Sequence, residues 1–234
     1  SVSMSGNYEE VWTGSTLQRS DYDPETESSG EKIEIKGFDR FGQYNFGMGI
    51  GTTVYGLFNF KKESKIEAIR HVIRPSINYS IRPSFDEYYD TYIIDANGNT
   101  AEYTRFEENF FGSPSKTYSS SIGLQISNNL EAKVRSKDSL ASDPKKITIL
   151  NNLNLSTSYN LAADSLKLSP VRMTGGTNLF NNKLNINLGA TFDPYQINEL
   201  GARIDKLNIK NGKSFRMTRA NRHMSFSIAS KGVG

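Results

Sequence analysis

Residues 44–60 form a long segment in which apolar side chains alternate with small or polar ones. This period of two indicates a β-strand with one apolar and one polar face. An ordinary soluble strand has roughly 5–6 residues, whereas a tilted membrane-spanning strand needs about 9–11. Aromatic residues stand at both ends of the apolar face, as they would at the two interfaces of a bilayer. The even positions carry Tyr44, Phe46, Met48, Ile50, Thr52, Val54, Gly56, Phe58 and Phe60, and the odd positions carry Asn45, Gly47, Gly49, Gly51, Thr53, Tyr55, Leu57 and Asn59.

The same alternation returns in four further segments, near residues 118–127, 147–161, 183–193 and 224–229. Their polar faces consist mainly of Gly, Ser, Thr and Asn, with almost no charge. Such a face suits the crowded, hydrated lumen of a barrel. A soluble β-sandwich is the alternative, but its strands would be shorter and its exposed faces more charged. The pattern therefore predicts an all-β, antiparallel meander that forms part of a large transmembrane outer-membrane β-barrel.

Composition excludes several other classes of protein. The chain has 234 residues, no cysteine and a net charge of +3, so we expect no disulfides, no thiolate chemistry and no nucleic-acid partner. It contains no apolar run of 18 or more residues, which argues against a transmembrane helix. It begins at Ser1 without a signal peptide and ends at Gly234 without a terminal aromatic residue. We therefore expect an internal piece of a longer protein.

The turn signals predict one partial barrel domain over residues 1–234, with about eight or nine strands and no second domain. Long loops are expected near 13–36 and 84–116, and up-and-down strands would place both on one rim. The second loop contains Asn97-Gly98 between two short apolar runs, which predicts a hairpin of its own. Shorter turns are expected at residues 61–65, 135–146 and 181–182.

No residues stand in a spacing typical of catalysis. His71 and His223 have no partners in the spacing of a triad or a zinc site, and we expect no catalytic residue, no metal and no cofactor. The segment Asp95–Asn99 is better explained as a hairpin tip than as a calcium loop. The acidic loop at residues 21–27 is a candidate for binding divalent cations, with a solvated loop as the alternative.

Three arginines stand at even-numbered positions in the segment before Pro83, so they would lie on the same face of a strand. If Ile77 and Tyr79 face lipid, then Arg70, Arg74 and Arg82 face the lumen. Arginine binds phosphate and carboxylate groups through paired hydrogen bonds. The three side chains are therefore candidates for contact with an anionic substrate or with a plug, and pairing with acidic neighbours is the alternative.

Several longer stretches resemble the barrel domain of LptD/OstA-type lipopolysaccharide assembly proteins, in the form found in Bacteroidetes. They are FNFKK at residues 58–62, KIEAIRHVIRPSINYS at 65–80, PSF at 83–85, YYDTY at 88–92, EYTRFE at 102–107, FGSPSK at 111–116, LNNLNLSTSYNLAADS at 150–165 and SFRM at 214–217. The resemblance covers residues 37–230 approximately and rests on extended similarity, because the family has no short catalytic signature.

The resemblance implies an outer-membrane translocon that inserts lipopolysaccharide into the outer leaflet. It implies as partners an LptE-like lipoprotein plug, lipopolysaccharide, outer-membrane lipid and a periplasmic Lpt bridge that acts through an N-terminal jellyroll, which this chain does not show. No family site residue transfers, because the strands that form the lateral opening cannot be located here. The alternatives are another outer-membrane barrel, such as a porin or a TonB-dependent transporter, and a soluble β-sheet binding module.

Overall fold

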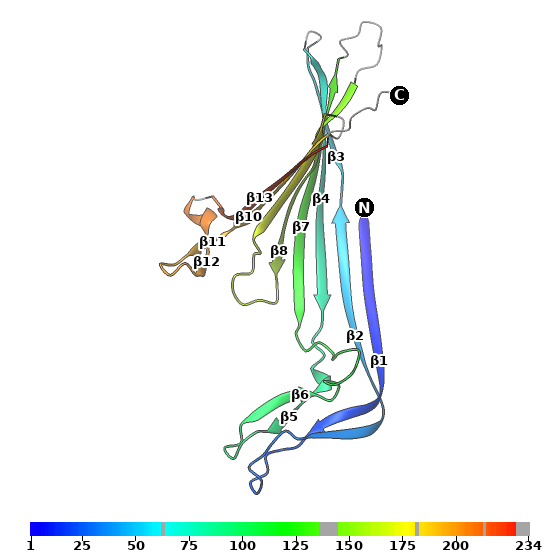
Figure 1. Ribbon diagram of the computed structural model, residues 1–234, viewed down its shortest axis with the longest axis vertical. Coiled ribbons are helices and arrows are strands. Elements are labelled where there is room, and N and C mark those ends of the chain that lie inside the picture. Colours follow the sequence, from blue (N-terminus) through cyan, green and yellow to red (C-terminus); the bar gives the residue numbers. More distant parts are fainter. Residues whose placement is uncertain (62–63, 136–144, 181–182, 213, 228–234) are drawn as a thin grey trace. The chain divides into compact units, whose positions relative to one another are not determined.

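The computed structural model describes residues 1–61, 64–135, 145–180, 183–212 and 214–227. Nine of its strands form one antiparallel sheet, in the order β1-β2-β4-β7-β8-β9-β10-β13, with β3 paired to β4 outside this path. Strands that follow one another in the sequence are neighbours in the sheet (Figure 1), so the expected meander is confirmed. Within the described residues the sheet is open, with β1 and β13 as its edges.

Most strands of this sheet are much longer than the roughly 5–6 residues that are typical of soluble proteins. Their bounds are β1 (Val2–Arg19), β2 (Lys32–Gly51), β3 (Val54–Asn59), β4 (Ile66–Arg82), β7 (Ser119–Val134), β8 (Lys145–Asn160), β9 (Val171–Leu179), β10 (Leu184–Asp193) and β13 (Arg216–Phe226). Two small hairpins stand apart from it, namely β5 (Tyr89–Ile93) with β6 (Thr100–Thr104), and β11 (Tyr195–Ile197) with β12 (Arg203–Leu207). Short 3₁₀ turns, η1 (Asp86–Tyr88) and η2 (Asn208–Asn211), precede β5 and follow β12.

The segment at residues 44–60 is strand as expected, but it is broken at Thr52 and Thr53. The register pairs Val54 with Ile73, which places Thr52 opposite Pro75. The Thr52 amide donates to the Pro75 carbonyl over 3.1 Å, but proline has no N–H to donate in return. The ladder is therefore interrupted at this point, and the strand divides into β2 and β3.

The first long loop is shorter than the sequence indicates. Strand β1 continues to Arg19 and β2 begins at Lys32, so the connection covers residues 20–31 instead of 13–36. The Ser20 amide donates to the Glu31 carbonyl over 3.1 Å, which keeps the hairpin paired despite its polar sequence. Leu17, only 7% exposed, shows that the polar run still buries an apolar position.

The second long connection, residues 83–118, contains the predicted hairpin. Strands β5 and β6 pair antiparallel around Gly98, whose φ of +79° is the left-handed conformation that glycine favours. Strands alternate in direction through the meander, so the long connections β1–β2 and β4–β7 lie at the same end of the strands. The turns expected at 61–65, 135–146 and 181–182 lie partly or wholly outside the described residues. Ile228, an apolar position of the segment predicted near 224–229, also lies outside them.

The chain divides into two compact units. The first contains residues 1–3, 49–79 and 121–234, and the second contains residues 4–48 and 80–120. In the second unit, Phe41 and Phe106 are each 1% exposed and pack with Val11 and Tyr88. This aromatic cluster fixes the connection after β6 against β1 and β2.

Candidate functional site

One face of the sheet in the first unit is polar across five strands. Residues that pair directly across an antiparallel ladder share a face, and here polar positions pair with polar positions from β7 to β13. We call this set the polar face: Gly123, Gln125, Ser127, Asn152, Asn154, Ser156, Ser158, Arg172, Thr174, Gly176, Asn185, Asn187, Gly189, Thr191, Arg219, Asn221 and His223.

The opposite face is apolar and exposed. Register pairs such as Ile126 with Leu155 and Ile186 with Met224 put large side chains on the same side. Leu188, Met224 and Phe226 are 49%, 52% and 63% exposed although they lie in well-paired strands. A face of this kind in a monomeric soluble domain would be costly to hydrate, so it indicates an apolar partner or a lipid environment.

Two features depart from a wholly apolar face. Arg222 lies opposite Leu188 on the edge strand β13 and places a charge on the otherwise apolar face. The His71 ring nitrogen Nε2 lies 3.1 Å from Asn128 Oδ1, and the Asn128 amide donates to the Leu153 carbonyl. This pair adjoins the register shifts between Asn128 and Glu131. We interpret His71 as a polar residue that supports this irregular stretch of the ladder.

Glycines make room for the amide side chains of the polar face. A Cβ placed on Gly176 would lie 2.9 Å from Asn187 Oδ1 and 3.5 Å from Asn152 Oδ1, both from neighbouring strands. The asparagine side chains therefore lie across the glycine backbone instead of standing upright from the sheet. The side chains of this face therefore project only a short distance from the sheet, and the surface that they form carries amide donors and acceptors.

The structure brings Arg70 and Arg74 together in one cleft of about 430 Å³ on the first unit. Arg70 lies 3.6 Å from the Glu131 carboxylate, and its guanidinium stands 5.5 Å from the centre of the Tyr55 ring. Arg74 is exposed. The other lining residues are Val72, Ser127, Asn128, Asn129, Glu131, Asn151, Asn152 and Asn154.

Arg82 is not part of this cleft. It lies at the end of β4 in the second unit, where its Nε atom is buried without a hydrogen-bond partner in the described part of the chain. Two arginines that the sequence reasoning did not select join the polar face instead. Arg172 and Arg219 both lie opposite Thr191, one on each side of it. No single-strand pattern reveals this, because it depends on the register of three strands.

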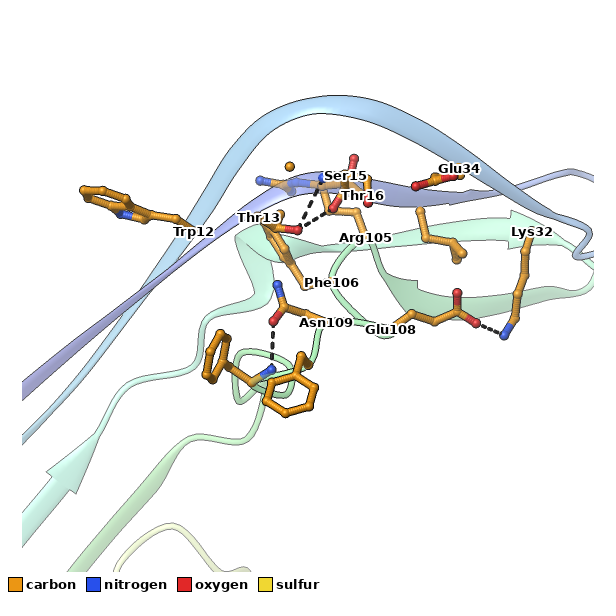
Figure 2. Close-up of a pocket in the computed structure, with 14 residues that line it drawn as sticks. Trp12, Thr13, Ser15, Thr16, Lys32, Glu34, Arg105, Phe106, Glu108 and Asn109 are labelled. Atoms are coloured by element: carbon orange, nitrogen blue, oxygen red, sulfur yellow. Dashed lines mark hydrogen bonds and ion pairs between the residues drawn. The ribbon is translucent and has the colours of Figure 1, made fainter.

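The second unit contains another cleft, of about 530 Å³ (Figure 2). Figure 2 shows Thr13, Ser15 and Thr16 of β1 on one side of it and Phe106 and Asn109 on the other. Much of its polar surface is already paired. Lys32 forms an ion pair with Glu108, and the Asn109 side chain accepts from the Phe111 amide over 2.9 Å.

The acidic loop uses its carboxylates to shape turns. Asp21 accepts from the Ile93 amide over 2.7 Å. Hydrogen bonds from the Glu25 backbone and then from Thr26 lower the pKa of Asp23. Within the described ranges no group of three or more His, Cys, Asp or Glu residues is placed to hold a metal ion. The segment Asp95–Asn99 is a hairpin tip, as expected, in which Asp95 accepts from the amides of Asn97 and Asn99.

None of the helical turns in the described residues has the length and apolar character needed to cross a membrane. Comparison with protein families gives one decisive result: the family described as "LptD protein" matches residues 1–195. The chain belongs to this family. No curated protein and no solved structure matches it significantly.

Membership of the LptD family assigns the chain to lipopolysaccharide transport at the outer membrane. It supports a role in transport instead of catalysis, and it favours this family over the porin, TonB-dependent transporter and soluble-module alternatives. The family also implies lipopolysaccharide and Lpt-pathway components as partners in general terms. The all-β meander with one polar and one apolar face agrees with this assignment.

Proposed function

We propose that this chain forms part of the wall of an outer-membrane β-barrel that inserts lipopolysaccharide into the outer leaflet. The polar face lines the hydrated lumen, and the opposite face contacts lipid. The observation that carries the proposal is the register from β7 to β13, which keeps amide, hydroxyl and glycine positions on one side of five strands. A lipid-facing sheet must alternate in this way.

The open edges fit the same proposal. Backbone groups that lack partners cannot stand in hydrocarbon, so only closed sheets of strands span a membrane. Within the described residues β1 and β13 each have one strand neighbour. The barrel is therefore completed by further strands that pair with these two edges.

Arginines on the inner side are proposed to contact the anionic parts of lipopolysaccharide or the plug. Lipopolysaccharide carries phosphates and acidic sugars, which guanidinium groups bind through paired hydrogen bonds. Arg74 is the strongest candidate of the predicted set Arg70, Arg74 and Arg82, because Glu131 already offsets part of the charge of Arg70. The asparagines around Arg74 provide donors and acceptors for sugar hydroxyls.

The proposed partners are an LptE-like lipoprotein that plugs the lumen and a periplasmic Lpt bridge that delivers lipopolysaccharide. The small, uncharged residues of the polar face leave space for such a plug. Acyl chains would leave on the lipid side, so that only the polar head crosses the hydrated interior.

The proposal is tested by changing all three arginines to glutamine in the full-length protein. Glutamine keeps hydrogen bonding but removes three charges, so we expect slower delivery of lipopolysaccharide to the cell surface or weaker association with the lipoprotein, with the barrel still assembled. Arg74→Gln alone should account for most of the defect. The matched control is Arg222→Gln on the opposite face, which should deliver lipopolysaccharide normally.

Normal surface lipopolysaccharide and an intact plug complex in the triple variant would show that these arginines are only structural. A defect of equal size in Arg222→Gln would show that the effect does not depend on the face of the sheet.

A further inference from the structure

Glu10 is the centre of a hydrogen-bonded network on the outward side of β1 and β2. Its carboxylate accepts from the Tyr8 hydroxyl over 3.2 Å and from Arg40 Nη1 over 2.6 Å. Trp12 stands two residues farther along the same face of β1. The Tyr8 and Arg40 side chains thus direct their polar ends to one carboxylate, although both side chains are exposed.

The network stands between apolar side chains and an aromatic pair on the exposed face of β1 and β2. On one side of it, Met4 of β1 and Phe46 of β2 are 71% and 42% exposed. On the other side, Trp12 and Phe38 are 65% and 73% exposed and pack edge to face with ring centres 6.0 Å apart. This order along the strands repeats that of a bilayer boundary, in which an apolar band ends at aromatic side chains with polar tips.

The opposite side of the same strands is covered, so the exposed side is the one available to a partner. Val11 and Phe41 alternate with the network residues and are buried against Phe106. Figure 2 shows Trp12 extending away from Phe106 and Asn109. The Tyr8 ring in turn lies across Gly42, where an added Cβ would be 2.8 Å from its hydroxyl. The exposed aromatic side chains are therefore held by the structure and are not loose.

We propose that Tyr8, Glu10, Trp12, Phe38 and Arg40 form a contact with the phosphate-bearing headgroup layer of the outer membrane. Tyr8 lies at the edge of the hydrocarbon, and the Trp12–Phe38 pair lies among the headgroups. Arg40 is 63% exposed and has five N–H donors, of which Glu10 takes one, so it presents donors to a lipid phosphate. This assignment rests on the proposed barrel and fixes where the bilayer ends along β1 and β2.

Trp12 is the one tryptophan of this chain, which makes its depth measurable. The full-length protein is reconstituted in phospholipid vesicles whose acyl chains carry bromine either near the headgroup or near the methyl end. The difference between the wild type and Trp12→Phe isolates the emission of Trp12. We expect bromine near the headgroup to quench it roughly two-fold more than deep bromine, because the hydrocarbon core is about 30 Å thick.

Two reporter variants in the Trp12→Phe background separate this inference from the barrel itself. Ile50→Trp should be quenched most by deep bromine if the sheet spans the membrane, and Leu200→Trp, which replaces a side chain 92% exposed in the β11–β12 turn, should not be quenched. Quenching of the Ile50→Trp reporter without quenching of Trp12 in the wild type would overturn the headgroup contact and leave the barrel intact. Absence of quenching at both positions would overturn the barrel.

The phosphate contact has its own test. Vesicles of phospholipid are compared with vesicles of a diacyl glycolipid that has no phosphate. The emission of Trp12 should be shifted further to the blue in phospholipid, and Arg40→Gln should abolish that difference. A difference that persists in Arg40→Gln would show that Arg40 does not bind the phosphate.

Discussion

At the scale of single residues, glycine decides how side chains of neighbouring strands lie. Gly49 illustrates this, because a Cβ there would lie 2.6 Å from Asn78 Oδ1 and 2.8 Å from Ser3 Oγ. The neighbouring Ile50 is 55% exposed on the other side of the strand. The two adjacent residues therefore lie on opposite sides of the sheet, as the alternation predicts. The assignment of these sides to lumen and lipid stays a prediction.

This arrangement predicts different costs for changes at the two positions. Ile50→Arg should destabilise the protein by about 2–4 kcal/mol if Ile50 lies near the bilayer midplane. Gly49→Ala should cost about 1 kcal/mol, because the polar ends of Asn78 and Ser3 can move aside. Unfolding by urea in lipid vesicles measures both. Equal costs, or a larger cost for Gly49→Ala, would contradict the assignment of the two faces.

The tip of the β5–β6 hairpin should depend on pH through Asp95. The hydrogen bond from the Asn99 side chain, followed by bonds from backbone amides, lowers the pKa of Asp95. A lowered pKa in the folded state means that the ionised form stabilises the hairpin. This contribution is fully present above the unfolded pKa of about 3.9 and is lost as the pH falls through the lower folded value.

Amide exchange in β5 and β6 measures this dependence. Protection should fall below about pH 4 in the wild type, whereas Asp95→Asn should show no pH-dependent step in this range. An identical step in the variant would show that Asp95 is not its source.

At the scale of elements, an aromatic cluster holds the connection after β6 in place. Phe106 is 1% exposed, with its ring centre 4.9 Å from that of Phe41 and 5.8 Å from that of Tyr88. Arg105 strengthens the contact, since it forms an ion pair with Asp39 and lies 4.7 Å from the Phe106 ring centre. The connection is thus a folded part of the second unit.

Phe106→Ala should therefore release this connection. Removal of a buried phenylalanine costs about 3–5 kcal/mol, and we expect local opening with the long strands unchanged. Limited proteolysis within residues 83–118 measures the effect. Phe110→Ala is the matched control, because Phe110 is 94% exposed and its truncation should change stability by about 0.5 kcal/mol or less. Equal cleavage of both variants would contradict the role of the cluster.

At the scale of the whole molecule, the two sheet edges should control association. An unpaired strand edge is a template for another strand. The 234-residue chain on its own in detergent should therefore self-associate, and light scattering would show a broad distribution of sizes. A monodisperse, closed barrel formed by this chain alone would contradict the proposal that further strands complete the wall.

Much of the architecture follows from local pattern. The period of two in residues 44–60 and 147–161 predicts long strands with distinct faces, and Asn97-Gly98 predicts the β5–β6 hairpin. The end of a polar strand is harder to predict, as residues 13–19 and 32–36 show, because ladder pairing holds side chains that would equally suit a loop. The alternation does not reveal the break at Thr52, since its cause is Pro75 on the neighbouring strand.

The candidate site, like the fold, follows partly from the sequence and partly from the tertiary structure. By itself the sequence determined which residues of each strand share a side, because side-chain direction alternates with a fixed period along any strand. It did not determine which residues of different strands meet. Only the tertiary structure placed Arg70 beside Glu131, Arg172 and Arg219 on either side of Thr191, and Arg40 beside Glu10. These contacts depend on strand register, which is set by backbone pairing across the sheet and leaves no signal within a single strand.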